Sequence, residues 1–577
     1  MDGAPAPAQT TEEGRTVGEA LALRAAAHPG RIACIHLERG EVPGEALSYA
    51  ELLRRAKGAA AALQARVPQG GRVLLVFPNE PAFVVAFLGC LLAGVVAVPV
   101  AVPRNARGTE RLLALAGAAG ASLAVVSPSL GPTLDRLRQA GPGLGWVAAD
   151  EVLAGRPEDW REPGLGGEAL AVLQFTSGST GTPKGVMVRH RNLLHNARML
   201  GEECGAGTEL RLVAWLPFFH DWGLVGCLLF PLLAGGTFIY FNPSDLLQRP
   251  RRWLEAVSRY RGTVICAPNF AYDLAARNAG DPGPPLDLSS LALAMLGAEP
   301  VRMETMELFA AAYGPHGFRR EALHPSYGLA ESTLIVTGGR RLAPPVHLTV
   351  DRAALEAGRA VPRPDGALEA RAIVGCGRAL LDQEVRIADP ATGSAMAEGE
   401  VGEVWIRGPS VTAGYWQRPE ETERTFGAAS VPGEAPWLRS GDLGFLREGE
   451  LFLCGRLKDV IIKAGANHFA EDLEHTAGQA HEGLRPGCGA AFGLEAGGQE
   501  RLVIVHEVNF GKRPDLAQVV GAIQRAVSRE HGVFADAIAL LRPGTLEKTS
   551  SGKVRRSHTR QLFGEGALDP LTLWQGW

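Results

Sequence analysis

Short apolar runs alternate with amphipathic stretches along most of the chain. From residue 17 to about residue 455, runs rich in Val, Ile and Leu predict strands, and stretches rich in Ala, Leu and Arg predict helices. Strands are expected at residues 72–76, 122–126, 262–267 and 291–297, and helices at residues 51–65, 110–115 and 252–259. Strands that alternate with helices indicate parallel sheets with helices on both faces.

The pattern changes towards the C-terminus. Residues 400–456 read as strand, turn and strand, with glycines between them, which predicts a small β-rich subdomain. After residue 456 the pattern is again mixed, with a strand at 502–508 and a helix at 515–530. A length of 577 residues exceeds what one core usually serves, so two or more domains are expected.

One apolar stretch is long enough to cross a bilayer, because residues 83–102 contain no charged side chain. Gly89, Gly94 and Pro99 interrupt it, which favours a helix at 81–92, a turn, and a buried strand at 95–100. A membrane span is the less favoured alternative, and we expect no stable membrane insertion.

Charge and cysteine usage exclude several classes of protein. The 58 basic and 62 acidic side chains nearly balance, which argues against a general nucleic-acid-binding protein. The eight cysteines are scattered and never form C-x-x-C, which argues against zinc ribbons and disulfide frameworks. Residues 1–15 lack the basic and apolar regions of a signal peptide. A cytoplasmic location is the simplest expectation.

The segment 173–186 carries the clearest chemistry, with the sequence Leu-Gln-Phe-Thr-Ser-Gly-Ser-Thr-Gly-Thr-Pro-Lys-Gly-Val. A predicted strand enters a loop of Gly, Ser and Thr, and Lys184 closes the loop. Backbone N–H groups, hydroxyls and an ammonium group together suit phosphate oxygens. The loop is not a Walker A motif, because Pro183 precedes the lysine and Gly185 replaces the Ser or Thr that would hold magnesium. A flexible linker is the alternative interpretation.

This segment resembles the phosphate loop of the adenylate-forming superfamily, which contains acyl-CoA synthetases, peptide-synthetase adenylation domains and luciferases. Further motifs of that superfamily follow in the same order along the chain. They are the segments 215–223, 297–300, 326–331, 437–442, 455–459 and 546–553. Each motif is weak alone, but six in the correct order are very specific.

The resemblance implies a site for ATP and magnesium. The implied catalytic residues are Lys553, Glu331 and Lys184, with Glu331 holding Mg²⁺. The implied ATP- or AMP-binding residues are Thr176, Ser177, Gly178, Ser179, Thr180, Gly181, Lys184, Gly297, Ala298, Glu299, Ser326, Tyr327, Gly328, Asp442 and Arg456. Because a carboxylate must meet an α-phosphate, positive charge is the central requirement of the reaction. Lys553 would bridge these two anions.

Phe219, His220, Asp221 and Trp222 are the residues implied at the acyl end. A carboxylate substrate is already nucleophilic, so His220 is not needed as a base and is expected to shape the acyl entrance, with Asp221 as its orienting partner. Amino-acid adenylating domains typically neutralise the substrate ammonium with a Phe-Asp pair in this segment. Here the segment reads Phe218-Phe219-His220 and is followed by the apolar run 224–233. Buried methylenes each contribute about 0.8 kcal/mol, so a fatty acid is the preferred substrate.

Within the superfamily, the chain most resembles the fatty acyl-AMP ligases, which pass the acyl group to the phosphopantetheine thiol of an acyl-carrier protein in polyketide, peptide or lipid assembly. The segments that carry this resemblance are 215–223, 327–331, 458–462, 467–469, 472–474 and 484–492, and residues 338–376 resemble the insertion of that branch. A surface loop without function is the alternative for the insertion. Many of these ligases lack the lysine of the phosphate loop, so Lys184 leaves room for a CoA ligase.

The resemblance also implies a fold and a domain plan. The expected fold class is α/β, with two doubly wound α/β subdomains, a β-rich subdomain at about 377–457 and a small mobile C-terminal α+β domain. The expected boundaries are a flexible tail at 1–16, an AMP-binding domain at 17–457 and a C-terminal domain at 458–577, with a hinge near Lys458.

Three functions follow in order of preference. The first is a ligase that forms acyl-AMP and loads a holo acyl-carrier protein. The second is a fatty acyl-CoA synthetase. The third is a non-catalytic nucleotide-binding protein of the same fold.

Overall fold

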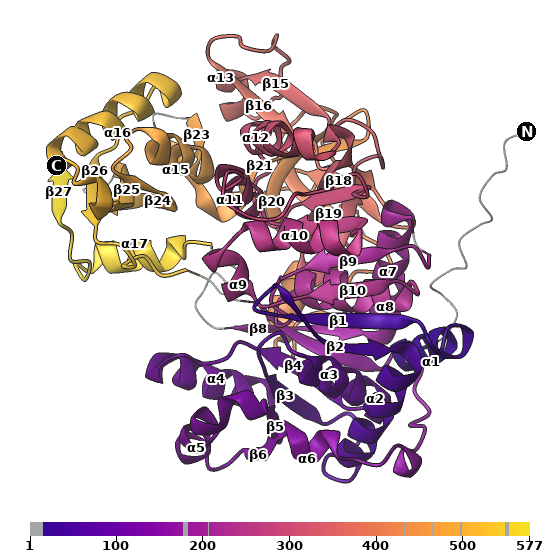
Figure 1. Ribbon diagram of the computed structural model, residues 1–577. Coiled ribbons are helices and arrows are strands. Elements are labelled where there is room, and N and C mark those ends of the chain that lie inside the picture. Colours follow the sequence, from indigo (N-terminus) through magenta and orange to yellow (C-terminus); the bar gives the residue numbers. More distant parts are fainter. Residues whose placement is uncertain are drawn as a thin grey trace, which may run out of the picture.

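The computed structural model describes residues 15–176, 183–205, 207–431, 433–463, 466–496, 499–548 and 553–577. Two large sheets lie side by side in the N-terminal part, and the C-terminal residues form a separate unit beside them (Figure 1). Residues 1–14 of the predicted tail lie outside the described residues. Of the predicted tail 1–16, only Arg15 and Thr16 are described. Thr16 is buried and caps the first helix, so it belongs to the folded part and not to the tail.

The first sheet has six strands in the order β6-β5-β3-β4-β7-β8. They are β3 (Arg72–Val76), β4 (Val96–Val100), β5 (Leu123–Val126), β6 (Gly145–Ala148), β7 (Leu170–Thr176) and β8 (Lys184–Arg189). All neighbouring pairs are parallel except β7 and β8. The helices are α2 (Tyr49–Gln64), α3 (Pro81–Ala93), α4 (Ala106–Ala119), α5 (Gly131–Ala140) and α6 (Ala149–Leu153).

Alternation of side chains along β3 explains why helices cover both faces of this sheet. Val73 and Leu75 belong to the core that contains α2 and α3, whereas Leu74 and Val76 lie in a second core with α4 and α5. The uncharged stretch 83–102 is α3 followed by β4, and the turn between them is made by Gly94 at φ 72°. No helix in the described part of the chain is long and apolar enough to cross a membrane.

The second sheet has nine strands in the order β17-β14-β13-β12-β11-β9-β10-β1-β2. They are β1 (Ile32–Glu38), β2 (Val42–Ser48), β9 (Arg211–Ala214), β10 (Thr237–Tyr240), β11 (Val264–Ala267), β12 (Leu293–Leu296), β13 (Leu323–Gly328), β14 (Ile335–Gly338) and β17 (Arg378–Ala379). The strands from β1 to β13 in this order are parallel, and the edge strands are antiparallel.

Helices of the second sheet include α1 (Val17–Ala27), α7 (His190–Cys204), α8 (Phe230–Leu233), α9 (Pro243–Gln248), α10 (Arg251–Tyr260), α11 (Asn269–Arg277) and α12 (Met303–Tyr313), with a π-helix at Trp222–Leu229. The predicted apolar run 224–233 is therefore helical, and its described side chains are buried. The parallel strands and the helices between them agree with the parallel α/β sheets that alternation predicted and with the α/β fold class that the resemblance implied.

The predicted β-rich region is an antiparallel sheet of four strands, β18 (Glu384–Ala388), β19 (Gly402–Arg407), β20 (Leu438–Arg447) and β21 (Glu450–Arg456). It also contains a helix that the pattern did not predict, α14 (Pro419–Phe426). The helix α14 is short and amphipathic, and none of its residues is buried. It was therefore not recognised among the glycine-rich strands around it.

The segment resembling an insertion leaves the second sheet after β14 and contains β15 (His347–Asp351), α13 (Arg352–Glu356) and β16 (Ala370–Val374). It contacts the C-terminal unit through charged side chains. Arg352 Nη2 lies 2.8 Å from Glu530 Oε1, and Arg371 Nη2 lies 3.0 Å from Asp472 Oδ1.

The C-terminal unit begins with the hairpin β22 (Val460–Lys463) and β23 (Ala466–Phe469). A sheet of β24 (Leu484–Ala496), β25 (Gln499–Val508), β26 (Ala537–Leu541) and β27 (Thr572–Gln575) follows, with α15 (Ala470–Gln479), α16 (Leu516–His531) and α17 (Arg556–Gly564). Its apolar side chains form two cores of their own, one on each face of the sheet. These cores are separate from those of the first two sheets.

Candidate active site

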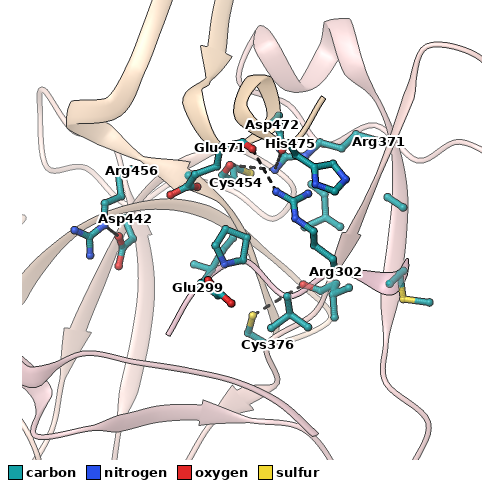
Figure 2. A pocket seen from close by; sticks show the side chains of 18 of the residues that line it. Glu299, Arg302, Arg371, Cys376, Asp442, Cys454, Arg456, Glu471, Asp472 and His475 are labelled. Carbon is teal, nitrogen blue, oxygen red and sulfur yellow. Dashed lines mark hydrogen bonds and ion pairs between the residues drawn. The ribbon is translucent and has the colours of Figure 1, made fainter. Parts of the chain in front are cut away.

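A cavity of about 330 Å³ lies between the second sheet, the β-rich sheet, the insertion-like segment and the C-terminal unit (Figure 2). Eight of the residues predicted from the motifs line it: Ala298, Glu299, Ser326, Tyr327, Gly328, Asp442, Arg456 and Lys553. These residues come from five separate motif segments of the chain. The fold therefore brings together side chains that the sequence separates by up to 255 positions.

The loop after β12 forms one wall of the cavity. Ala298 adopts a left-handed backbone conformation at φ 63°, which turns the chain sharply before Glu299. Gly297 lies so close to β13 that an added Cβ would be 2.8 Å from the Ser326 carbonyl oxygen, so only glycine fits there. Burial raises the pKa of Glu299, although its carboxylate accepts a 2.7 Å hydrogen bond from the Phe270 N–H group and lies near Lys553.

Tyr327 and Asp442 meet across the cavity from two different sheets. The buried Tyr327 hydroxyl donates a 2.8 Å hydrogen bond to Asp442 Oδ2. Asp442 Oδ1 accepts a 3.0 Å hydrogen bond from Arg456 Nε, and these two residues are direct partners in the register of β20 and β21. The Asp442 carboxylate raises the pKa of Arg456, which keeps this guanidinium charged. Figure 2 shows Asp442 and Arg456 side by side at one end of the cavity.

Lys553 reaches the same cavity from the C-terminal unit. Burial lowers the pKa of Lys553, and the positive charge of Arg456 lowers it further, against the attraction of Glu299, Glu471 and Asp442. The hinge candidate Lys458 lies in the short turn Leu457–Asp459 between β21 and β22, where desolvation and Arg456 lower its pKa. It does not line the cavity.

The predicted phosphate loop is only partly described. Thr176 ends β7 and Lys184 begins β8, and the two residues are partners in the antiparallel register. Ser177, Gly178, Ser179, Thr180 and Gly181 lie outside the described residues. Lys184 Nζ lies 2.8 Å from Glu421 Oε2 and 4.9 Å from the centre of the Tyr415 ring.

Glu331 lies in a single turn of 3₁₀ helix, Ala330–Ser332, just after β13. Its Oε1 accepts a 2.7 Å hydrogen bond from the Tyr415 hydroxyl, and burial raises its pKa. Among the described residues, no group of three or more His, Cys, Asp or Glu side chains is placed to hold a metal ion. A single carboxylate nevertheless fits Mg²⁺, which keeps several waters and binds one or two carboxylates together with substrate phosphates.

The acyl-end candidates lie at the start of the π-helix. His220 Nδ1 is 2.6 Å from Asp221 Oδ1, and the same oxygen accepts a 2.7 Å hydrogen bond from the Trp222 N–H group. The Phe219 carbonyl oxygen accepts a 2.7 Å hydrogen bond from Gln174, which lies on β7. Burial would raise the pKa of Asp221, but His220 and, more weakly, Lys553 lower it. Lys553, which lines the cavity, is therefore close enough to Asp221 to influence its pKa.

The sequence comparisons decide the family. The model of the family described as AMP-binding enzyme matches residues 21–416, which is more than half of the chain. The chain belongs to this family of AMP-binding enzymes. A second family model, described as Disco-interacting protein 2-like, AMP domain, matches residues 458–571.

Relatives of this AMP-binding enzyme cover nearly its whole length. It is 41% identical over 567 residues to the medium-chain-fatty-acid–[acyl-carrier-protein] ligase JamA of Moorena producens, covering 96% of both chains. It is similar to a structure from a study of fatty acyl-adenylate ligases of E. coli and L. pneumophila, with a TM-score of 0.88, 31% identity, and 97% and 99% of the two chains covered. It also resembles the L. pneumophila fatty acyl-adenylate ligase in complex with acyl adenylate and pyrophosphate, with a TM-score of 0.74, 34% identity and 98% of each chain covered.

Two residues that sequence analysis missed connect the separate parts of the site in this AMP-binding enzyme. Tyr415 contacts both Glu331 and Lys184, and Glu421 forms the ion pair with Lys184. Both lie in the stretch Gly-Tyr-Trp-Gln-Arg-Pro-Glu-Glu at 414–421, which has no periodicity and no recognisable ligand spacing. The only sequence signal was Tyr415 itself, one of seven tyrosines in the chain.

Proposed function

We propose that this AMP-binding enzyme activates a fatty acid as acyl-AMP and transfers the acyl group to the phosphopantetheine thiol of an acyl-carrier protein. The observation that carries the proposal is the meeting of Lys553, Asp442 and Tyr327 at one cavity. A buried apolar helix begins at Trp222, directly after Asp221, whose pKa Lys553 helps to lower. The names of the relatives support the choice of a fatty acid and a carrier protein.

In the first half-reaction, a carboxylate oxygen of the fatty acid attacks the α-phosphorus of ATP. The new bond is the acyl–phosphate C(O)O–P bond, and the bond from the α-phosphorus to the bridging oxygen of pyrophosphate breaks, so pyrophosphate leaves with its electron pair. Lys553 would lie between the two anions and reduce their repulsion. Lys184 and the phosphate loop would hold the β- and γ-phosphates.

The nucleoside would be held by the residues around Tyr327. The Tyr327 ring offers an apolar face to adenine, and the Asp442 carboxylate accepts hydrogen bonds from the ribose hydroxyls. Glu331 would hold Mg²⁺, which supplies positive charge to the phosphates when bound. The Tyr415 hydroxyl keeps the Glu331 carboxylate in one orientation.

In the second half-reaction, the thiol sulfur attacks the acyl carbonyl carbon. The C–S bond forms, the C–O bond to AMP breaks, AMP leaves, and the thiol proton passes to solvent. Because Lys553 is needed at the cavity for the first step and a thiol must enter for the second, we propose that residues 458–577 move as a domain relative to residues 17–457, with a hinge near Lys458.

The second candidate is a fatty acyl-CoA synthetase, which the general synthetase form of the phosphate loop with Lys184 favours. Ion pairs between the insertion-like segment and the C-terminal unit argue against it, since they would restrict rotation of that unit. Incubation with ATP, radiolabelled fatty acid, and either CoA or holo carrier protein separates the two functions. Label on carrier protein is expected, and label on CoA alone would contradict the proposal.

A further inference from the structure

Lys184 of the phosphate loop already has an anionic partner in the structure. Its Nζ lies 2.8 Å from Glu421 Oε2, and the two side chains are 18% and 25% exposed. Within the part of the chain that the structure describes, no group other than Lys184 donates a hydrogen bond to the buried Glu421 Oε2. The ammonium that is expected to bind phosphate oxygens is therefore engaged by a carboxylate.

Backbone contacts fix the segment that carries Glu421 against the phosphate loop and Glu331. The Trp416 N–H group donates to the Gly185 carbonyl oxygen at 2.8 Å, and the Met187 N–H group donates to the Gly414 carbonyl oxygen at 2.9 Å. The Thr412 N–H group donates to the Glu331 carbonyl oxygen at 3.0 Å. Because α14 follows this segment directly, the backbone contacts place Glu421 beside Lys184.

The carboxylate and a triphosphate compete for the same ammonium group. An ammonium has three N–H donors and can contact more than one anion, but Glu421 and the β- and γ-phosphates repel each other when both lie within hydrogen-bonding distance of it. Glu421 has other cations on its own helix. Its Oε1 lies 4.0 Å from Arg418 Nη1, and Lys184, then Arg418 and Arg424, lower the pKa of Glu421.

We propose that Glu421 is a positioning residue. It pairs with Lys184 while no polyphosphate is bound, and it releases Lys184 to the phosphates when ATP or pyrophosphate binds. This inference rests on the phosphate-binding role given to Lys184 in the proposed function. When ATP binds, Lys184 turns to the phosphates and Glu421 turns to Arg418 and Arg424. After acyl-AMP has formed, the return of Lys184 to Glu421 weakens the hold on pyrophosphate and helps it to leave.

The exchange predicts an effect on ligands that carry the β-phosphate and none on AMP. Dissociation constants for pyrophosphate, α,β-methylene-ATP and AMP are measured by calorimetry on the full chain. Glu421→Gln is expected to tighten binding of the first two ligands about fivefold, the effect of removing a partly exposed ion pair, and to leave AMP binding unchanged. Steady-state turnover of Glu421→Gln should show a lower KM for ATP together with a lower kcat, because pyrophosphate leaves more slowly.

Two further variants separate exchange from general electrostatics. Glu420→Gln removes the same charge from the neighbouring, exposed position of α14 and is expected to leave all three affinities unchanged. In a Lys184→Gln background, Glu421→Gln should no longer tighten binding, because no ammonium remains to be released. Weaker or unchanged pyrophosphate binding by Glu421→Gln, or tightening that persists without Lys184, would overturn the inference. Wild-type protein that binds the ATP analogue but forms no acyl-AMP would instead contradict the proposed function, and the comparison of affinities would still stand.

Discussion

The Tyr327 hydroxyl donates a 2.8 Å hydrogen bond to Asp442 Oδ2, although the two residues are 115 positions apart and belong to different sheets. Arg456 Nε donates to the other carboxylate oxygen at 3.0 Å. The carboxylate proposed to bind ribose is thus oriented before a nucleotide arrives, and Tyr327, which is proposed to lie against adenine, links it to the second sheet. Preorganisation of this kind reduces the entropy lost on binding.

Removing that hydroxyl should therefore weaken nucleotide binding more than catalysis. Tyr327→Phe keeps the ring and loses the hydrogen bond, which is worth about 1 kcal/mol, or about fivefold in affinity. The KM for ATP is expected to rise by about that factor with little change in kcat, as measured by pyrophosphate release. As a control, Tyr313→Phe removes a buried 2.7 Å hydrogen bond to the Ala275 carbonyl oxygen away from the cavity and should lower the Tm only. An unaltered KM in Tyr327→Phe would show that Arg456 alone orients Asp442.

The lowered pKa of Lys553 makes the first half-reaction sensitive to alkaline pH. Burial and Arg456 favour the neutral amine, so the proton is lost below the ordinary lysine value of 10.5. Because the charged form is needed to bridge two anions, the rate of acyl-AMP formation is expected to fall as the pH rises through this lowered pKa. Transfer from supplied acyl-AMP to carrier protein should not show this alkaline loss.

Substitutions of Lys553 check the same assignment. Lys553→Ala is expected to abolish acyl-AMP formation and to leave transfer from supplied acyl-AMP largely intact, whereas Lys458→Pro should show the opposite selectivity. Lys553→Arg keeps its charge at high pH, so its alkaline loss should disappear. Its activity at neutral pH should still be about 100-fold low, because a planar guanidinium does not replace a compact ammonium. Equal loss of both half-reactions in Lys553→Ala would remove Lys553 from its proposed role.

The ion pair between Arg371 and Asp472 provides a test of acceptor choice. Arg371→Ala breaks this 3.0 Å contact between the insertion-like segment and the C-terminal unit. If such contacts restrict rotation of that unit, the variant should gain transfer of radiolabelled acyl groups to CoA while keeping acyl-AMP formation. Arg363→Ala is the matched control, because Arg363 pairs with Asp351 inside the insertion-like segment at 2.6 Å. Equal CoA transfer by both variants would argue against a restricting role for Arg371.

Sequence motifs predicted the parts of the site that use special residue types, and they missed the parts that depend on packing. Asp442, Tyr327 and Lys553 stand in motifs where glycines and charged residues keep a fixed order, so their meeting at one cavity was expected. Tyr415 and Glu421 were not predicted, because they reach the site through pairing of residues 413–416 with β8, a contact across more than 200 positions. Periodicity reports local burial and carries no information on such pairing.

The same distinction holds for the fold. The apolar run of β3 and the amphipathic pattern of α2 specified their elements to within two residues. The helix α14 and the π-helix at Trp222–Leu229 were missed. The π-helix was missed because it depends on close packing. An added Cβ on Gly223 would lie 2.0 Å from the Pro217 carbonyl oxygen, and a uniformly apolar run does not reveal such a tertiary contact.

The glycine at position 226 of the π-helix should control the length of the acyl chain. An added Cβ at Gly226 would lie 2.7 Å from Trp222 Cδ1 and 2.8 Å from Leu334 Cδ2, so Gly226→Ala must displace the Trp222 ring. Trp222 is one of the four residues that the resemblance assigns to the acyl end. Each methylene that no longer fits loses about 0.8 kcal/mol, or about fourfold in affinity.

A panel of fatty acids of graded length in a pyrophosphate-release assay measures this effect. For Gly226→Ala, the KM is expected to rise about fourfold for each excluded methylene of the longer acids, while the KM for ATP stays unchanged. Gly117→Ala is the control, because nothing lies within 4 Å of a Cβ added there, and it should not alter chain-length preference. Since overpacking of a core costs about 1–3 kcal/mol, the Tm of Gly226→Ala is measured in parallel. A uniform rise in KM for all acids, with no change in preference, would place Trp222 away from the end of the acyl chain.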